Sequence, residues 1–311
     1  MNIVDFFDNR RYWEEKRNKF LNRIYFYALW NRIVVVAANI ILPVYFKLTA
    51  NNKKYALKNT DKKEYRYIVS LTSFPTRIPR LWLVVESILR QNIKPDKIVL
   101  YLQVSSEDLL PKNLLALKKR GVEIELCDSS LRSHNKYYHA FKNYPKDNII
   151  TVDDDTFYRS DFIENLINCN KKYPECIICN WARIISNKTD LYRNWYPVTE
   201  PSISKLYLPI GVAGVLYPPN CMYKDIFDQE LIKRYTLSAD DIFLTCMALL
   251  NGTKKYFTGY KQHILEVLIK DNIKLITENI SQNKNQECVD NLNQHYQKVL
   301  GIRPFIDLIN N

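Results

Sequence analysis

Asn148-Ile-Ile-Thr-Val-Asp-Asp-Asp155 joins an apolar run to three consecutive carboxylates. The β-branched residues of this run suit a buried strand. Three aspartates at the end of such a strand would repel one another unless a cation lies among them. Because alternate side chains of a strand share a face, we expect Asp153 and Asp155 to point the same way. Two hard oxygen ligands in this arrangement suit Mg²⁺ or Mn²⁺, which also take phosphate oxygens. The competing interpretation is a solvated acidic turn.

The sequence on either side of the aspartates predicts strands that alternate with helices. We expect strands at 67–72, 97–102, 122–126 and 148–152, and helices at 79–91, 111–120 and 134–143. This order is typical of right-handed βαβ units, so we predict an α/β fold with a mostly parallel, Rossmann-like sheet flanked by helices. Ligands of such sheets bind beyond the carboxyl ends of the strands, where both 73–77 and 153–155 fall.

Composition narrows the possible classes of protein. With 47% hydrophobic and 25% charged residues, the 311-residue chain is neither disordered nor fibrous. Its 6 glycines fit no GxGxxG or GxxxxGK[ST] motif, which argues against a dinucleotide fingerprint and a P-loop. The 7 cysteines are scattered, which indicates free thiols in a reducing compartment.

The N-terminal part is basic and aromatic. Residues 1–64 contain 13 Lys and Arg against 6 Asp and Glu, which favours contact with a phosphate-rich surface such as anionic lipid. The apolar run 33–46 is too short to span a bilayer comfortably, so we expect a helix lying in the membrane interface. A signal anchor and a helix packed on the rest of the protein remain alternatives. Residues 51–64 are polar and are expected to form a linker.

Several polar residues are candidates for binding a nucleotide. Thr72 and Ser73 could bond a base or ribose, Phe74 could stack, and Arg77 could pair with a diphosphate. A turn with a surface arginine would explain them equally well. Lys136 stands near the start of a predicted helix, where a cation opposes the helix dipole, and this misfit favours a binding role.

Two later segments could complete a site. Gly211 and Gly214 permit either a flexible wall beside a ligand or a simple hairpin. Asp240 and Asp241 open an apolar helix. Helix capping accounts for one acid, and the pair together suits a general base.

The order of five segments resembles GT-A nucleotide-sugar glycosyltransferases, and more narrowly the family-2-like bacterial enzymes of surface-polysaccharide clusters. These segments are 69–78, 95–102, 150–155, 211–219 and 239–243. Together they cover about residues 65–250, which is more specific than an isolated Asp-x-Asp pattern. The resemblance implies a GT-A domain at 65–262, whereas the helical extension expected at 1–64 and the helical tail expected at 263–311 lie outside the match.

The resemblance also implies roles for individual residues. Mn²⁺ or Mg²⁺ on Asp153 and Asp155 would hold the donor diphosphate, and Asp154 would face away or contact ribose. Asp241 would be the catalytic base, with Asp240 as the second candidate. His263 is a candidate third metal ligand, with a surface histidine as the alternative.

The expected reaction moves a sugar from a nucleotide-diphosphate donor, with UDP-sugar expected, to a glycan or lipid-linked glycan, with inversion. We expect a cytoplasmic enzyme, peripheral on the inner face of the membrane, and no nucleic-acid partner; a signal-anchored protein is the alternative. Rival functions are a metal-dependent phosphatase, which also uses Asp-x-Asp, a glycoside hydrolase with two carboxylates and no metal, and a non-catalytic sugar- or nucleic-acid-binding module.

Overall fold

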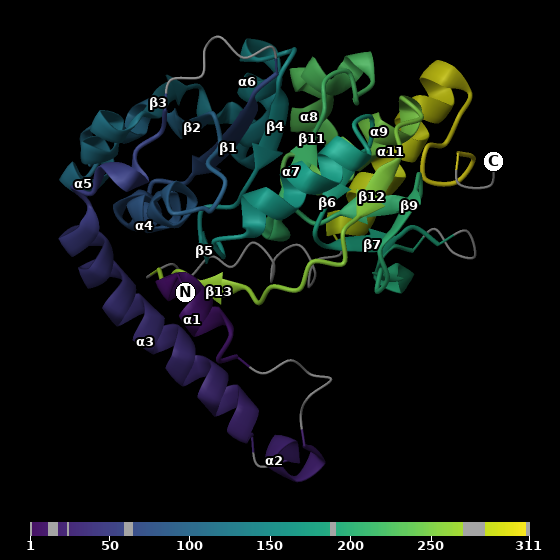
Figure 1. Cartoon of the computed structure of the whole chain (residues 1–311). Coiled ribbons are helices and arrows are strands. Elements are labelled where there is room, and N and C mark those ends of the chain that lie inside the picture. Colours follow the sequence, from purple (N-terminus) through teal and green to yellow (C-terminus); the bar gives the residue numbers. More distant parts are fainter. Residues whose placement is uncertain are drawn as a thin grey trace.

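An eight-stranded sheet forms the centre of the computed structural model (Figure 1). The structure describes residues 2–11, 18–23, 25–58, 65–186, 191–269 and 284–308. In spatial order its strands are β3 (Val122–Cys127), β2 (Lys97–Gln103), β1 (Tyr67–Ser73), β4 (Asn148–Thr151), β11 (Val215–Tyr217), β6 (Ile177–Cys179), β12 (Lys255–Phe257) and β9 (Ser202–Ser204). A smaller sheet pairs β10 (Tyr207–Pro209), β7 (Ala182–Ile184) and β8 (Tyr196–Pro197).

The sheet is mostly parallel, as predicted. Strands β3, β2, β1 and β4 are parallel neighbours, and so are β6 and β12. Strand β11 runs antiparallel between β4 and β6. All four residues of β4 are buried, which agrees with the run of β-branched side chains that predicted this strand.

Helices cover both faces of the sheet, as the α/β prediction requires. On one face α4 (Ile78–Leu89) and α7 (Phe162–Lys172) share a core with Val69 and Ile150. On the other face lie α6 (Asn135–Asn143) and α9 (Asp240–Leu250). Shorter helices are α5 (Lys112–Ala116) and α8 (Gln229–Tyr235).

The N-terminal extension is helical and packs on this domain. It contains α1 (Ile3–Asp8), α2 (Lys19–Arg23) and α3 (Phe26–Thr49), of which α3 projects obliquely away from the domain toward α2 in Figure 1. Buried residues of α1 and α3 belong to the same core as α4, so the extension and the domain share one hydrophobic interior. Of the expected linker, residues 59–64 lie outside the described residues.

Helix α3 is longer than the apolar run that predicted it. Its 24 residues and mean hydropathy of 1.6 would allow it to cross a membrane by length and composition alone, a test that core helices and signal sequences also pass. One third (33%) of its most apolar window is buried inside the protein. The expectation that this segment is too short to span therefore does not hold for the helix as folded, which continues through Pro43 to Thr49.

The C-terminal part returns to the domain at two places. Strand β13 (Leu265–Glu266) pairs with β5 (Thr156–Phe157), directly after the three aspartates. Helix α11 (Lys284–Leu300), the expected helical tail, packs on α9 through Val289, Leu292 and Tyr296.

Candidate active site at the carboxyl ends of the strands

The three aspartates lie in the turn between β4 and β5. They follow the end of β4 at Thr151, one residue earlier than the expected strand end at Val152. Their side chains differ in exposure to solvent. Asp153 and Asp155 are 30% and 37% exposed, whereas Asp154 is only 7% exposed. The turn therefore presents its first and third carboxylates outward and its second inward.

Asp154 fastens the aspartate turn to the end of β1. Its Oδ2 accepts a 2.5 Å hydrogen bond from Ser73 Oγ, and its Oδ1 lies 2.8 Å from Arg77 Nη1. Arg77 Nη1 also lies 3.0 Å from Asp155 Oδ2. We expected Ser73 to contact a nucleotide and Asp154 to face away or contact ribose. Both are buried and bonded to each other, so in this structure they position the turn.

The other two candidates from the first strand lie nearby. Thr72 Oγ1 donates a 2.7 Å hydrogen bond to the Tyr101 carbonyl on β2, so this hydroxyl is directed at the neighbouring strand. Phe74 follows β1 and is half-buried at the start of the turn that leads into α4. Arg77, at the N-terminal end of α4, is the one member of this group that reaches the aspartates' outer face.

Negative charge is concentrated at the outer face of the aspartate turn. Burial, followed by the charges of Asp153 and Asp154, raises the pKa of Asp155 to about 6, although Arg77 opposes the shift. A carboxylate with a raised pKa favours an additional cation beside it. This is the property that the expected Mg²⁺ or Mn²⁺ ligands should have.

Lys136 connects the aspartate turn to α9. Its Nζ lies 2.9 Å from Asp153 Oδ1 and 2.8 Å from Asp240 Oδ2, and its side chain is only 7% exposed. Burial alone would lower the pKa of Lys136, but Asp153, Asp240 and Asp241 hold it well above its ordinary value. These acids compensate for the cation's unfavourable place in the first turn of α6.

Asp241 faces the same small space as Asp153 and Lys136. Its Oδ2 accepts a 3.1 Å hydrogen bond from the backbone N–H of Gly211. A Cβ added to Gly211 would lie 3.0 Å from Asp241 Oδ1, 3.2 Å from Lys136 Nζ and 3.7 Å from Asp153 Oδ1. The structure thus brings the two acidic segments together, and Gly211 leaves room between them that a side chain would fill.

The two acids of α9 differ in protonation. Although burial raises the pKa of Asp240, the charges of Lys136 and His134 bring it down to about 2. Burial, followed by the charge of Asp240, raises the pKa of Asp241 to about 7. Neighbouring carboxylates whose pKa values are driven apart are characteristic of acid–base sites. Asp241 is the member of the pair suited to exchanging a proton near neutral pH.

Gly214 and His263 do not reach this space by the contacts that the structure gives them. Gly214 has φ +80°, and a Cβ there would lie 2.3 Å from Phe162 Cζ. Glycine is therefore needed here for the backbone conformation and for packing against Phe162, and the structure gives it no contact with the space beside Gly211. His263 Nδ1 lies 3.5 Å from Asp8 Oδ1 in α1, and its backbone N–H donates to the same oxygen. The ring is therefore directed toward the N-terminal helix.

Among the described residues, no group of three or more His, Cys, Asp and Glu side chains is arranged to hold a metal ion. Asp153 and Asp155 remain as two exposed carboxylates with excess negative charge, a donor set that fits a hard cation which completes its coordination with water and phosphate oxygens.

Tyr158 is a part of the site that sequence patterns did not reveal. The backbone N–H of Asp153 donates to its hydroxyl at 2.9 Å, and that hydroxyl donates to the Val212 carbonyl at 3.3 Å. Tyr158 thereby links the aspartate turn to the segment that contains Gly211. Its only signal in the sequence was its place three residues after the last aspartate.

No protein-family model matches the chain, and a search of curated proteins finds no significant match.

Proposed function

We propose that this protein is a GT-A-type glycosyltransferase that transfers a sugar from a nucleotide-diphosphate donor, with UDP-sugar expected, to a hydroxyl of a glycan or lipid-linked glycan. One observation carries the proposal. Asp153 and Asp241 both lie close to Gly211. Lys136 contacts Asp153 and also Asp240, the residue directly before Asp241. A carboxylate for the donor side and a carboxylate for the acceptor side thus border one space at the carboxyl edge of the sheet.

The donor half of the proposed site consists of the aspartate turn and the two cations around it. Asp153 and Asp155 would hold Mg²⁺ or Mn²⁺, which when bound neutralises charge on the departing diphosphate. Arg77 and Lys136 already lie between carboxylates at this edge, where they offer fixed positive charge to phosphate oxygens. Asp154 keeps the turn in place through its bonds to Ser73 and Arg77.

The acceptor half consists of Asp241 and the Gly211 backbone. With its pKa raised to about 7 by burial and by Asp240, Asp241 can accept the proton of an attacking hydroxyl near neutral pH. The Gly211 N–H fixes the orientation of this carboxylate. A single base acting on the hydroxyl that displaces the diphosphate gives inversion at the sugar carbon.

We further propose that the protein lies on the inner face of a membrane. The outward side of α3 carries an apolar stripe, here called the α3 stripe, made of Leu29 (63% exposed), Ile33 (51%), Ile40 (64%), Val44 (56%) and Leu48 (81%). A continuous stripe of this kind on a basic N-terminal segment suits the interface of an anionic bilayer. A signal-anchored arrangement, in which α3 crosses the membrane, is the alternative.

Transfer from nucleotide sugars tests the function. Purified protein should bind one of a panel of nucleotide sugars in calorimetry with Mn²⁺ and release the nucleoside diphosphate. Asp153→Asn and Asp155→Asn should abolish release, whereas Lys171→Gln, a surface change on α7, should leave it intact. Full activity in excess chelator would refute the metal's role. Phosphate release from a simple phosphate ester, with no nucleotide-sugar binding, would replace the proposal with the phosphatase alternative.

A further inference from the structure

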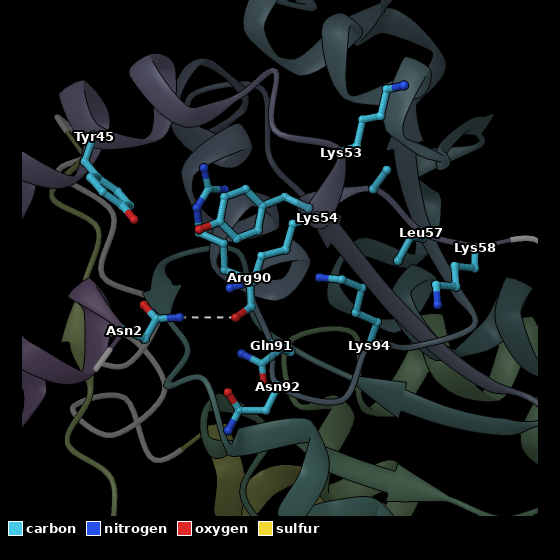
Figure 2. A pocket seen from close by; sticks show the side chains of 12 residues that line it. Asn2, Tyr45, Lys53, Lys54, Leu57, Lys58, Arg90, Gln91, Asn92 and Lys94 are labelled. Atoms are coloured by element: carbon cyan, nitrogen blue, oxygen red, sulfur yellow. Dashed lines mark hydrogen bonds between the residues drawn. The ribbon is translucent and has the colours of Figure 1, made fainter.

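A second pocket lies at the opposite edge of the sheet from the aspartates. It has a volume of about 870 Å³ and is formed by Asn2, Tyr45 of α3, the segment 53–58 and the segment 90–94 (Figure 2). Segment 90–94 leads into the first residue of β2, whereas the aspartates follow the last residue of β4. Since β2, β1 and β4 are parallel, the two sites lie at opposite ends of the strands.

The charged side chains that line this pocket are all basic. Of the described residues that line it, none is acidic and five are cationic: Lys53, Lys54, Lys58, Arg90 and Lys94. In Figure 2, Lys54 and Lys94 lie beside Arg90, whereas the Lys53 ammonium points away from them. Cations gathered in a concave, partly desolvated site concentrate anions there more strongly than the same charges on a flat surface.

Arg90 forms a rigid part of the pocket wall. Its side chain is only 1% exposed, it pairs with Glu86, and its guanidinium carbon lies 4.3 Å from the Tyr55 ring centroid. Arg120 Nη1 lies 2.6 Å from the other oxygen of Glu86. One buried carboxylate therefore serves two guanidinium groups, and a surplus of positive charge remains at the wall.

Lys94 shows the effect of this surplus. Its Nζ donates a hydrogen bond to the Leu89 carbonyl. Burial, followed by the charges of Arg120, Arg90 and Lys54, lowers the pKa of Lys94 to about 8. An anion among these groups would relieve the repulsion and restore the ordinary affinity of the amine for its proton.

We propose that this basic pocket binds a phosphate-bearing ligand, either the headgroup of an anionic lipid or a soluble phosphorylated compound. The volume accommodates a group larger than a single phosphate. Lysine and arginine side chains on several sides match the tetrahedral distribution of phosphate oxygens. The lipid source has additional support, because Tyr45 at the pocket lies three residues, about one helical turn, before Leu48 of the α3 stripe. The inference does not depend on glycosyl transfer.

Calorimetry with inorganic pyrophosphate tests the pocket directly. Lys54→Gln/Lys94→Gln should bind pyrophosphate at least tenfold more weakly than the wild type at low ionic strength, in chelator to silence the aspartate site. Lys171→Gln/Lys298→Gln removes the same charge from exposed positions on α7 and α11 and should bind as the wild type does. If Lys94 proves necessary for folding, Lys54→Glu alone should still weaken binding. The pocket variant should keep its nucleotide-sugar activity, which separates this test from that of the proposed function.

Vesicle flotation distinguishes the two sources of phosphate. The wild type and both double variants are compared on vesicles of phosphatidylcholine with and without phosphatidylglycerol. Weaker flotation of the pocket variant on the anionic vesicles alone assigns the site to a lipid headgroup. Equal flotation of all three proteins, together with weaker pyrophosphate binding by the pocket variant, assigns it to a soluble ligand. Failure of the wild type to bind either probe, or equal binding of both probes by all three proteins, overturns the proposal.

Discussion

Replacing Asp241 with Asn tests the proposed base through stability as well as activity. The carboxylate is buried and its pKa is raised to about 7, first by burial and then by Asp240. Asn has nearly the same shape and keeps an oxygen that can accept the Gly211 N–H. The substitution therefore removes the charge while preserving most of the packing. We expect Asp241→Asn to be more stable than the wild type in alkaline solution and almost inactive.

The expected gain follows from proton linkage. The folded wild type keeps the Asp241 proton up to about pH 7, whereas the unfolded chain releases it near its ordinary pKa of 3.8. The stability contributed by the raised pKa is therefore full below 3.8 and is lost as the pH rises to about 7. Each pH unit in this window removes about 1.36 kcal/mol from the wild type and nothing from the variant. The difference should widen by about 3 kcal/mol between about pH 5 and about pH 8.

Urea unfolding followed by tryptophan fluorescence at these two pH values measures the difference, and nucleoside-diphosphate release measures activity. Release should fall by roughly 10²- to 10⁴-fold, the contribution typical of a general base. Asp240→Asn is the control. The lowered pKa of Asp240, about 2, gives stability that is present above 3.8 and lost only as the pH falls toward 2. Its loss should cost about 3 kcal/mol at about pH 5 from breaking the pair with Lys136, and less at about pH 8, because removing the Asp240 charge also lowers the pKa of Asp241. A pH-independent difference for Asp241→Asn, or retained release, would refute the reasoning.

Three further predictions concern the two glycines, the aspartate turn and the α3 stripe. Gly211→Ala should fold normally but release nucleotide at least tenfold more slowly, because its Cβ would lie 3.0 Å from Asp241 Oδ1. Gly214→Ala should instead lose about 3 kcal/mol of unfolding free energy, because φ is +80° and Phe162 lies 2.3 Å from the added atom. If Gly211→Ala and Gly214→Ala lowered the melting temperature equally, the different roles of the two glycines would be contradicted. Asp155→Asn should lose Mn²⁺-dependent donor binding in calorimetry, and unchanged metal dependence would remove Asp155 from the metal site. Ile33→Asp/Ile40→Asp should weaken vesicle binding roughly 100-fold, from about 3 kcal/mol of lost apolar burial, whereas Val299→Asp on α11, 60% exposed, should not.

Strands and helices were predictable wherever each carried a clear local signal. Strands β1 and β4 have apolar runs that end in turn residues, and α4 has proline in its first turn. The antiparallel strand β11 was not predicted, because three residues after Gly214 resemble a hairpin arm and nothing local specifies their place between β4 and β6. Strand order depends on distant pairing, which a single sequence does not encode locally.

Site residues were predictable where the local sequence placed a charged side chain in an unfavourable position. Lys136 opposes a helix dipole, and this misfit correctly indicated that the lysine has acidic partners. The partners of Asp154, Gly214 and His263 could not be predicted, because Ser73, Phe162 and Asp8 are far away in the sequence. In each case the deciding contact is a tertiary one.

The N-terminal helix shows a different limit. Both faces of α3 are apolar, so hydropathy could not tell the buried side, with Leu42 and Phe46, from the exposed α3 stripe. Removing this helix entirely would also remove part of the domain's core, because Leu42 and Phe46 pack there. Point changes on the exposed side are therefore the cleaner test of membrane contact.

The pairing of β13 with β5 has a consequence for biosynthesis. The Val267 N–H donates to the Asp155 carbonyl at 2.7 Å, so the outer edge of the aspartate turn is closed by a segment made more than a hundred residues later. At the other end of the chain, Asp5 accepts hydrogen bonds from Ser160 just beyond β5. During translation, Asp5 of α1 is made before the turn, and Val267, which follows β13, is made long after it. A nascent chain released before Val267 emerges would carry all three aspartates but lack the backbone bond that completes their turn.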